Sequence, residues 1–301
     1  MNKLKQITCI LPERIRRVIE SEFSSGCIEF DRLTEIRIRV ERPLMLMFNP
    51  GGERIYEQLR ITPDDIAYMI QMITRYSMYA YQDNIRQGYV TISGGHRVGL
   101  IGQTMADKGR ICGQKYISFM NIRVAHEVIG CADKLMDFIC DGSFKNTLLI
   151  SPPGCGKTTL LRDIVRHISY GKKCRPMKVA LVDERSEIAA CHVGIPQNDI
   201  GPRTDVMDMG LKAEGMLMLV RSMSPEVIAV DELGGRKDME AVRQIICCGC
   251  KVLASVHGYS IKDCYKRPEL IPLLGANGFE RAVVISDRLG AGTIEEERKL
   301  E

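Results

Sequence analysis

A glycine-rich segment in the second half of the chain has the residue types and spacing of a phosphate-binding loop. Gly154 and Gly156 allow backbone N–H groups to approach phosphate oxygens, and the helix that starts after them adds a favourable dipole. Lys157 is suited to reach the β- and γ-phosphates, and the Thr158 hydroxyl is suited to bind Mg²⁺. The segment follows an apolar strand, Thr147–Ile150, as this motif requires. We expect ATP to bind along the whole loop, which consists of Ser151, Pro152, Pro153, Gly154, Cys155, Gly156, Lys157, Thr158 and Thr159.

Two carboxylates follow another apolar strand about 70 residues downstream. Val227–Val230 leads directly into Asp231 and Glu232, which is the arrangement of a Walker B motif. Asp231 is expected to hold the magnesium ion, usually through water, and Glu232 to polarise the attacking water. An Asp-Glu pair alone is a weak signal, because it could merely begin a solvated turn. At a full βαβ spacing after a phosphate loop, it indicates ATP hydrolysis.

Polar residues also follow two other apolar strands. Asp183 and Glu184 come after Val179–Val182. This strand lies between the two motifs in the chain, and with the glutamate of Walker B it is typical of the additional-strand, catalytic-glutamate division of P-loop ATPases. His257 follows Val252–Val256 and is expected to hydrogen-bond the γ-phosphate or the water and to sense hydrolysis. A single histidine after a strand is also common as a structural residue.

Short apolar strands alternate with helices throughout the second half of the chain. Such strands predict a parallel sheet that is covered on both faces. Together with the motifs they predict an α/β, RecA-like P-loop ATPase core over residues 144–301, beginning after the turn residues Asp141–Ser143. The predicted strands are Thr147–Ile150, Val179–Val182, Val227–Val230, Val252–Val256 and Ala282–Ile285.

The first half predicts a smaller α+β domain over residues 1–143. Leu11–Phe23 carries an apolar stripe at helical spacing, and Thr62, followed by proline and two aspartates, has the signature of a capped helix start. Glu35–Val40 alternates strictly between polar and apolar residues, as a half-buried strand does. Two β-type runs flank Gly94–Gly95 and predict a hairpin.

Composition narrows the class of protein. The 301 residues include 42 Lys+Arg and 38 Asp+Glu, with no basic arm or polybasic run, which speaks against direct binding of nucleic acid or lipid. No apolar stretch is long enough for a membrane span, and the first residues do not form a secretory signal, so we expect a cytoplasmic protein. The 12 cysteines then indicate a reducing compartment. Cys247, Cys248 and Cys250 lack the partners of a zinc site and are interpreted as small side chains at a helix end.

These residues together resemble the hexameric secretion ATPases of type II, type IV and pilus-retraction machines. That family carries a Walker A box, an Asp box, a Walker B box and a His box, which correspond here to Ser151–Thr158, Asp183–Glu187, Val227–Glu232 and Ser255–Ser260. The similarity is closer still to the stage III sporulation protein AA family of endospore-forming bacteria. Further segments that carry this resemblance are Glu35–Arg39, Gly94–Gly99, Asp199–Val206 and Arg221–Pro225.

The resemblance implies a function, partners and a location. It implies a ring-shaped homo-oligomer, with six subunits as the expected number, that hydrolyses ATP with Mg²⁺. It also implies a mother-cell ATPase that powers or assembles the channel between mother cell and forespore. Contact with the membrane would then be peripheral, through membrane-embedded channel proteins.

The sequence departs from the family pattern in two ways. Ser151 replaces the usual first glycine of the loop. In secretion ATPases the base is often assigned to the Asp-box glutamate, whereas this chain has both Glu184 and Glu232. The identity of the base therefore stays open between these two, and we favour Glu232 because it directly follows Asp231.

Arginines from a neighbouring subunit are a further expectation. In ATPases that hydrolyse at a subunit interface, such an arginine commonly stabilises the charge of the transition state. A surface ion pair is the more common role for any single arginine. Within the set we favour Arg203 and Arg221 as catalytic residues. The candidates are Arg97, Arg123, Arg185, Arg203 and Arg221.

Two other classes of function remain open at this point. A nucleic-acid translocase or helicase could use a similar core, although the even charge of both halves of the chain disfavours it. A nucleotide-gated scaffold could bind ATP, hardly hydrolyse it, and assemble partners by binding alone.

Overall fold

The computed structural model describes residues 3–24, 29–107 and 109–300. The chain divides into two compact units, Met1–His126 and Glu127–Glu301. The sequence suggested a boundary between residues 143 and 144. In the structure, residues 127–143 belong to the second unit instead. Turn residues such as Asp141–Ser143 form loops within a domain as readily as linkers between domains.

Packing explains why the segment after His126 belongs to the second unit. Leu135, Met136 and Ile139 are fully buried in the core of that unit. The backbone N–H of Ala132 donates to Asp163 at 2.8 Å. This segment is thus fixed by apolar burial and by a buried carboxylate, neither of which is visible in its own sequence.

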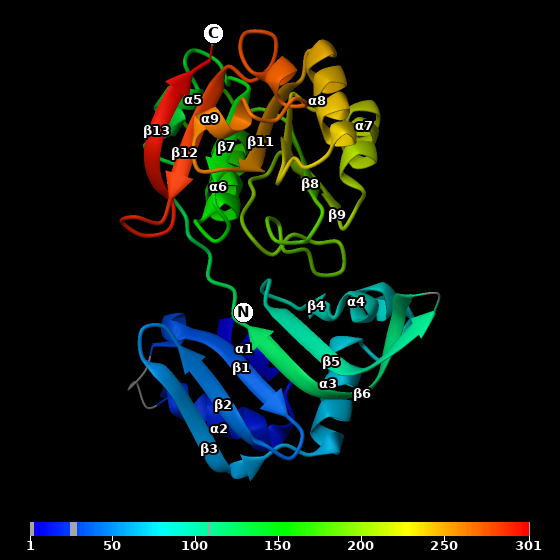
Figure 1. Cartoon of the computed structure of the whole chain (residues 1–301). Coiled ribbons are helices and arrows are strands. Elements are labelled where there is room, and N and C mark those ends of the chain that lie inside the picture. Colours follow the sequence, from blue (N-terminus) through cyan, green and yellow to red (C-terminus); the bar gives the residue numbers. More distant parts are fainter. Residues whose placement is uncertain (1–2, 25–28, 108, 301) are drawn as a thin grey trace. The chain divides into compact units, whose positions relative to one another are not determined.

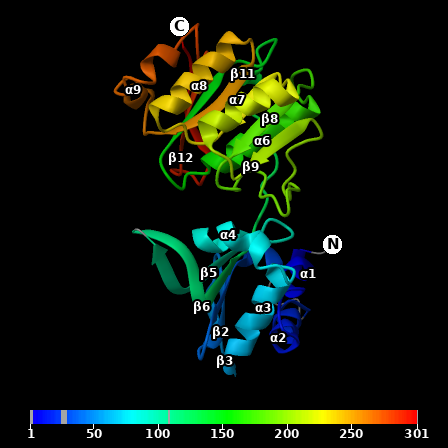
Figure 2. The same ribbon diagram turned by 90° about the vertical axis from the view of Figure 1, so that its right-hand side faces the viewer.

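The first unit is an antiparallel sheet backed by helices. The sheet has the strand order β3-β2-β1-β6-β5-β4, and helices α1, α2 and α3 lie on one side of it (Figure 2). The helices are α1 (Lys3–Thr8), α2 (Glu13–Ser24), α3 (Pro63–Ile73) and α4 (Gln82–Gln87), with short 3₁₀ turns at Phe30–Arg32 and Tyr79–Tyr81. The strands are β1 (Leu33–Arg39), β2 (Pro43–Phe48), β3 (Gly52–Arg60), β4 (Tyr89–Thr91), β5 (Arg97–Asp107) and β6 (Arg110–Arg123).

Local sequence accounts for most of these elements. Ile36 and Ile38 of β1 are fully buried, while Arg37 between them is exposed. Helix α3 begins with a capping box, because the Asp65 N–H donates to Thr62 Oγ1 at 3.3 Å and the Thr62 N–H donates to Asp65 Oδ2 at 2.7 Å. The expected helix near the N-terminus and the expected hairpin are both present.

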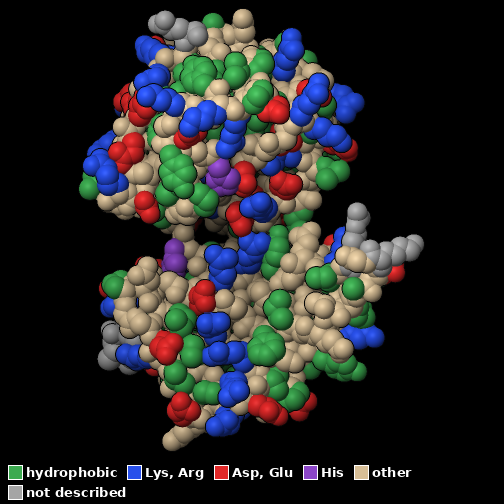
Figure 3. Space-filling model, in the orientation of Figure 1, with side chains coloured by type: hydrophobic (Ala, Val, Ile, Leu, Met, Phe, Trp, Pro, Cys, Tyr) green, Lys and Arg blue, Asp and Glu red, His purple; other side chains and the backbone are tan. Residues whose placement is uncertain are grey.

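The face of the first unit's sheet that points away from α1, α2 and α3 carries arginines. Arg97 of β5 and Glu35 of β1 both pair in register with Arg123 of β6, so the three side chains form a row. The guanidinium of Arg97 also stacks on the Tyr89 ring, with its carbon 3.5 Å from the ring centroid. Basic side chains gather on this unit in the space-filling view (Figure 3). Two of the arginines that the sequence offered as candidates therefore occupy one face.

Residue His96 in the β4–β5 turn predicts an acid-sensitive first unit. It is fully buried, and its Nδ1 accepts the Ala125 N–H at 3.0 Å, which requires an unprotonated ring nitrogen. Burial lowers the pKa of His96 from 6.5 to about 4. The unfolded chain protonates His96 more readily than the folded chain does. The stabilising contribution of neutral His96 is therefore complete above pH 6.5 and is lost as the pH falls toward 4.

We therefore expect the free energy of unfolding of the wild type to fall by about 3 kcal/mol over that interval from this group alone. His96→Gln should flatten this part of the profile. Urea unfolding at several pH values measures the slope. Equal slopes for the wild type and His96→Gln would contradict the expectation.

The second unit is an α/β domain with a mainly parallel sheet, and Figure 1 labels most of its elements. Its helices are α5 (Met136–Ile139), α6 (Lys157–Tyr170), α7 (Lys212–Met223), α8 (Arg236–Cys247) and α9 (Ile261–Cys264), with a 3₁₀ turn at Ile271–Leu273. Its strands are β7 (Thr147–Ser151), β8 (Val179–Asp183), β9 (Thr204–Asp208), β10 (Val227–Val230), β11 (Lys251–His257), β12 (Arg281–Ser286) and β13 (Thr293–Lys299).

The strand order of this sheet is β13-β12-β7-β11-β10-β8-β9. All neighbouring pairs are parallel except β12 and β13. The strand inserted between β7, which leads into the glycine-rich loop, and β10, which leads into the paired carboxylates, is β11. The chain order had suggested β8 for that role, but β8 lies on the far side of β10.

Two apolar cores cover the two faces of this sheet. Leu149 packs with α5 and α6, whereas its neighbours Leu148 and Ile150 pack with α7, α8 and α9. The alternation follows from the pleat of a strand, and it explains why the strands are apolar throughout. The parallel sheet covered on both faces that the sequence predicted is confirmed.

Candidate active site

The glycine-rich loop joins β7 to the first turn of α6. Gly156 has φ of 83°, in the left-handed region, and a Cβ built there would lie only 2.9 Å from the Gly292 nitrogen. The Gly292 N–H donates to the Cys155 carbonyl at 2.8 Å. The loop is thus held from outside by the turn between β12 and β13, and only glycine fits at its closest point.

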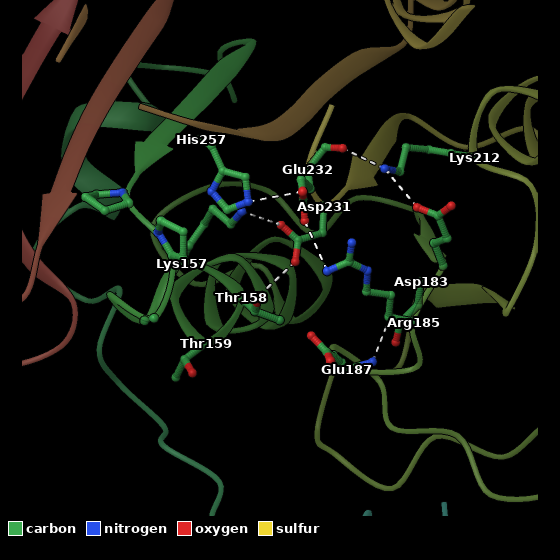
Figure 4. Close-up of a pocket in the computed structure, with 15 residues that line it drawn as sticks. Lys157, Thr158, Thr159, Asp183, Arg185, Glu187, Lys212, Asp231, Glu232 and His257 are labelled. Atoms are coloured by element: carbon green, nitrogen blue, oxygen red, sulfur yellow. Dashed lines mark hydrogen bonds and ion pairs between the residues drawn. The ribbon is translucent and has the colours of Figure 1, made fainter. Parts of the chain in front are cut away.

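A pocket of about 350 Å³ opens over this loop. It brings together the four boxes predicted from sequence, which are contributed by the ends of β7, β8, β10 and β11 (Figure 4). Ser151 and Cys155 are buried and do not line it. The lining residues are Pro152, Pro153, Gly154, Gly156, Lys157, Thr158, Thr159, Asp183, Glu184, Arg185, Glu187, Lys212, Asp231, Glu232 and His257.

Asp231 is the centre of a small polar network. Its Oδ2 accepts the Thr158 hydroxyl at 2.8 Å, and its Oδ1 accepts the Ser255 hydroxyl and lies 3.6 Å from Lys157 Nζ. A hydroxyl and a carboxylate held side by side are the hard oxygen ligands that Mg²⁺ prefers. Thr158 and Asp231 therefore fit the ion that the sequence led us to expect.

Glu232 is held in a strained conformation beside this network. Its φ of 53° lies in the left-handed region, which costs of order 1–3 kcal/mol for a residue with a side chain. The Glu232 N–H donates to Ser255 Oγ at 2.8 Å. Its carboxylate oxygens lie 3.1 Å from His257 Nε2 and 3.4 Å from an Arg185 nitrogen. The carboxylate thereby faces the pocket between two basic groups.

The two acidic residues after β8 differ in what they contact. Asp183 is buried and accepts the backbone N–H groups of Glu187, Ile188 and Ala189 at 2.8–2.9 Å. Burial raises the pKa of Asp183 above its ordinary value, although these hydrogen bonds act in the opposite direction. Asp183 thus fixes the loop that follows it, whereas Glu184 points to Lys212, at 2.9 Å.

His257 lies between the phosphate loop and Glu232. Its Nδ1 is 3.4 Å from the Ser151 carbonyl, while its Nε2 faces the Glu232 carboxylate. The Arg267 guanidinium holds the His257 carbonyl at 2.6 Å. The His257 imidazole therefore lies against both the loop that would hold phosphate and the Glu232 carboxylate of Walker B.

The candidate arginines separate into three groups. Arg185 lines the pocket and contacts Glu232 of its own chain. Arg203 donates to the Ser169 carbonyl at 2.9 Å, and Arg221 donates to the Leu217 carbonyl of its own helix at 3.2 Å, so neither lines this pocket. Arg97 and Arg123 belong to the first unit.

Sequence reasoning did not single out Lys212, and it named Ser255 only as the first residue of the His box. Lys212 is the first residue of α7, and its Nζ donates to the Glu232 carbonyl at 2.6 Å. Ser255 lies within the otherwise apolar run Val252–Val256 of β11 and is fully buried. A hydroxyl within such a strand could have been noticed, but no local signal marks Lys212.

Ser255→Ala should impair the site more than the fold. The change leaves the Glu232 N–H without its partner, and an unsatisfied polar group costs about 1–3 kcal/mol. The same change releases the main chain of Glu232, and because a small displacement of the base is costly, we expect turnover to fall by about tenfold or more. Ser222→Ala, on the exposed side of α7, is the matched control. Steady-state ATPase assays and thermal unfolding measure the two effects, and an unchanged turnover number would contradict the expectation.

The chain is similar over nearly its whole length to one family of known proteins. The family model described as Sporulation stage III, protein AA matches residues 1–298. The Stage III sporulation protein AA of Bacillus subtilis (strain 168) is 41% identical over 292 residues, which make up 97% of this chain and 94% of that protein.

Solved structures of a pilus retraction motor and of an ATPase share the fold. The pilus retraction motor PilT with bound ADP has a TM-score of 0.60 at 14% sequence identity, over 89% of this chain and 76% of PilT. The ATPase DotB of Legionella pneumophila has a TM-score of 0.55 at 13% identity, over 90% and 75% of the two chains. The predicted RecA-like ATPase core with a smaller α+β domain is confirmed. In the described ranges, no helix has both the length and the apolar character of a membrane span.

Proposed function

Because the chain belongs to the Sporulation stage III, protein AA family, we propose that it is a Mg²⁺-dependent ATPase that energises a secretion-like channel between mother cell and forespore. It works as a ring-shaped homo-oligomer, with six subunits as the expected number. Its partners are membrane-embedded channel proteins, and it reaches the mother-cell membrane from the cytoplasm only through them.

A single observation carries the enzymatic part of the proposal. The ammonium of Lys157, the hydroxyl of Thr158 and the carboxylates of Asp231 and Glu232 line one pocket above a glycine-rich loop. This is the set of groups that phosphoryl transfer to water requires.

Each group has a distinct role in hydrolysis. The loop N–H groups and Lys157 bind the phosphates of ATP, and Thr158 and Asp231 hold the magnesium ion. Bound Mg²⁺ neutralises charge that develops on the phosphate oxygens. Glu232 accepts the proton of the attacking water, and His257 orients the Glu232 carboxylate and reports the state of the γ-phosphate. Glu184 is the second candidate for the base.

An arginine from the neighbouring subunit completes the site in this proposal. Arg203 and Arg221 remain candidates, since contacts within one chain do not test a role in the next subunit. Arg97 and Arg123 are candidates as well, because they lie side by side and present two guanidinium groups on one face of the sheet. Replacing each arginine by Ala and mixing the variant with Lys157→Ala subunits tests whether it complements in trans.

The proposal is tested by turnover and mass measured together. Purified full-length protein is assayed for phosphate release with Mg-ATP, and its mass is measured by light scattering with and without nucleotide. We expect turnover and assembly for the wild type and for the exposed control Lys237→Ala, and loss of turnover for Lys157→Ala. A protein that stays monomeric at high concentration with Mg-ATP would contradict the ring.

Two further measurements separate the alternative functions. A nucleic-acid translocase should be stimulated by single- or double-stranded DNA with a steep salt dependence. A nucleotide-gated scaffold should support sporulation when Glu232 is replaced by Gln, whereas a motor should fail.

A further inference from the structure

We propose that Lys212 is a positioning residue for hydrolysis, which fixes the main chain of Glu232 and is itself held by Glu184. This inference rests on the proposed ATPase function. It assigns a role to a lysine that lies in no Walker, Asp or His box, and it gives Glu184 a task other than that of the base.

The geometry around Lys212 has one donor and two acceptors. Lys212 Nζ donates to the Glu232 main-chain carbonyl at 2.6 Å and lies 2.9 Å from Glu184 Oε2. Its side chain is only 11% exposed, against 46% for Glu184. Figure 4 shows the Lys212 ammonium with a dashed line to the Glu232 carbonyl. A buried ammonium needs such partners, so its position is set by them.

The contact matters because Glu232 is strained. With φ of 53° it occupies a conformation that persists only where surrounding contacts hold it. Ser255 holds its N–H at 2.8 Å, and Lys212 holds its carbonyl. These two bonds fix both peptide groups that flank the Glu232 side chain, and thereby the direction in which its carboxylate points.

Glu184 then acts through Lys212. The two carboxylates have different neighbours: Glu232 lies between His257 and Arg185, whereas Glu184 is paired with the lysine. Glu232 directly follows Asp231, which accepts the Thr158 hydroxyl, whereas the Glu184 carboxylate is turned toward the lysine. The arrangement therefore favours Glu232 as the base and assigns Glu184 to the support of its main chain.

Lys212→Met, which keeps the length of the side chain but removes its charge, tests the inference. We expect kcat to fall about 10- to 100-fold, because a small displacement of the base is sufficient for such a loss. The KM for ATP and the affinity for a fluorescent ATP analogue should stay within twofold. Lys212→Arg should recover most of kcat, since a guanidinium can also donate to the carbonyl and pair with Glu184. Lys237→Met, in the first turn of α8, is the matched control.

A double-mutant cycle with Glu184→Ala gives the second readout. If Glu184 acts through Lys212, its replacement should lower kcat in the wild type but have little further effect in the Lys212→Met background. If Glu184 is the base, the two losses should multiply, and the inference would be overturned. Weakened ATP binding by Lys212→Met without rescue by Arg would also overturn it, because Lys212 would then contact the nucleotide.

Wild-type turnover distinguishes the possible failures. A wild type that hydrolyses ATP together with a Lys212→Met variant of unchanged kcat would sink this inference alone. A wild type that binds ATP without turnover would overturn the proposed function, and the inference with it.

Discussion

Glu232→Gln is expected to lower kcat for ATP hydrolysis by about 10²- to 10⁴-fold, which is the usual contribution of a general base. The amide has the same shape and can keep its contact with His257, but it cannot accept the proton of the attacking water. Binding of ATP should persist, because the phosphate loop and Asp231 are untouched. Phosphate release measured at saturating ATP, beside a titration with a fluorescent ATP analogue, separates the two quantities.

Glu240→Gln provides the control for this substitution. Glu240 lies on the exposed side of α8, paired with Arg236, and is not among the lining residues of the pocket. Its replacement should leave both quantities unchanged. Retention of more than a tenth of wild-type turnover by Glu232→Gln would show that another group takes the proton.

Gly156→Ala is the second substitution with a large expected effect. An alanine at φ of 83° costs about 1–2 kcal/mol, and its Cβ would also press against the Gly292 backbone nitrogen at 2.9 Å. Since backbone cannot move aside as a side chain can, the loop must shift and its N–H groups lose their alignment. We expect ATP affinity to fall at least about tenfold, equivalent to 1.4 kcal/mol, with a lower melting temperature.

Gly142→Ala isolates the contribution of strain from that of the clash. Gly142 also has a positive φ, of 68°, but a Cβ there would meet nothing within 4 Å. This variant should be modestly destabilised and should bind ATP normally. Equal ATP affinities of the Gly156→Ala variant and the wild type would show that the loop adapts to the added methyl group.

The sequence predicted those parts of the molecule that depend on local patterns. The apolar strands of the second unit and the strictly alternating strand β1 were recognisable because burial on two faces or on one face leaves a distinct pattern. Strands β3, β9 and β13 were missed. Each lies at an edge of its sheet and carries several polar residues, as in Thr293–Lys299, so its pattern resembles that of a loop.

Long-range contacts explain the rest of what the sequence could not predict. Nothing near Lys212 indicates that it will meet Glu232, and nothing near Leu135 or Met136 indicates that these residues complete the core of the second unit. The position of β11 between β7 and β10 is likewise a property of the sheet rather than of the chain order. The residues of the candidate site that stand directly at strand ends were predictable, because parallel strands bring such residues together at one edge.

The hydrogen bond from the Gly292 N–H to the Cys155 carbonyl also has a consequence for folding during synthesis. About 140 residues separate the two, and at typical rates of synthesis this interval lasts on the order of ten seconds. For most of that time the nascent chain already contains its phosphate loop. It still lacks β12, which pairs with β7, and the turn that hydrogen-bonds to the loop. We therefore expect a nascent chain to retain nucleotide only late, after the turn that contains Gly292 has left the ribosome.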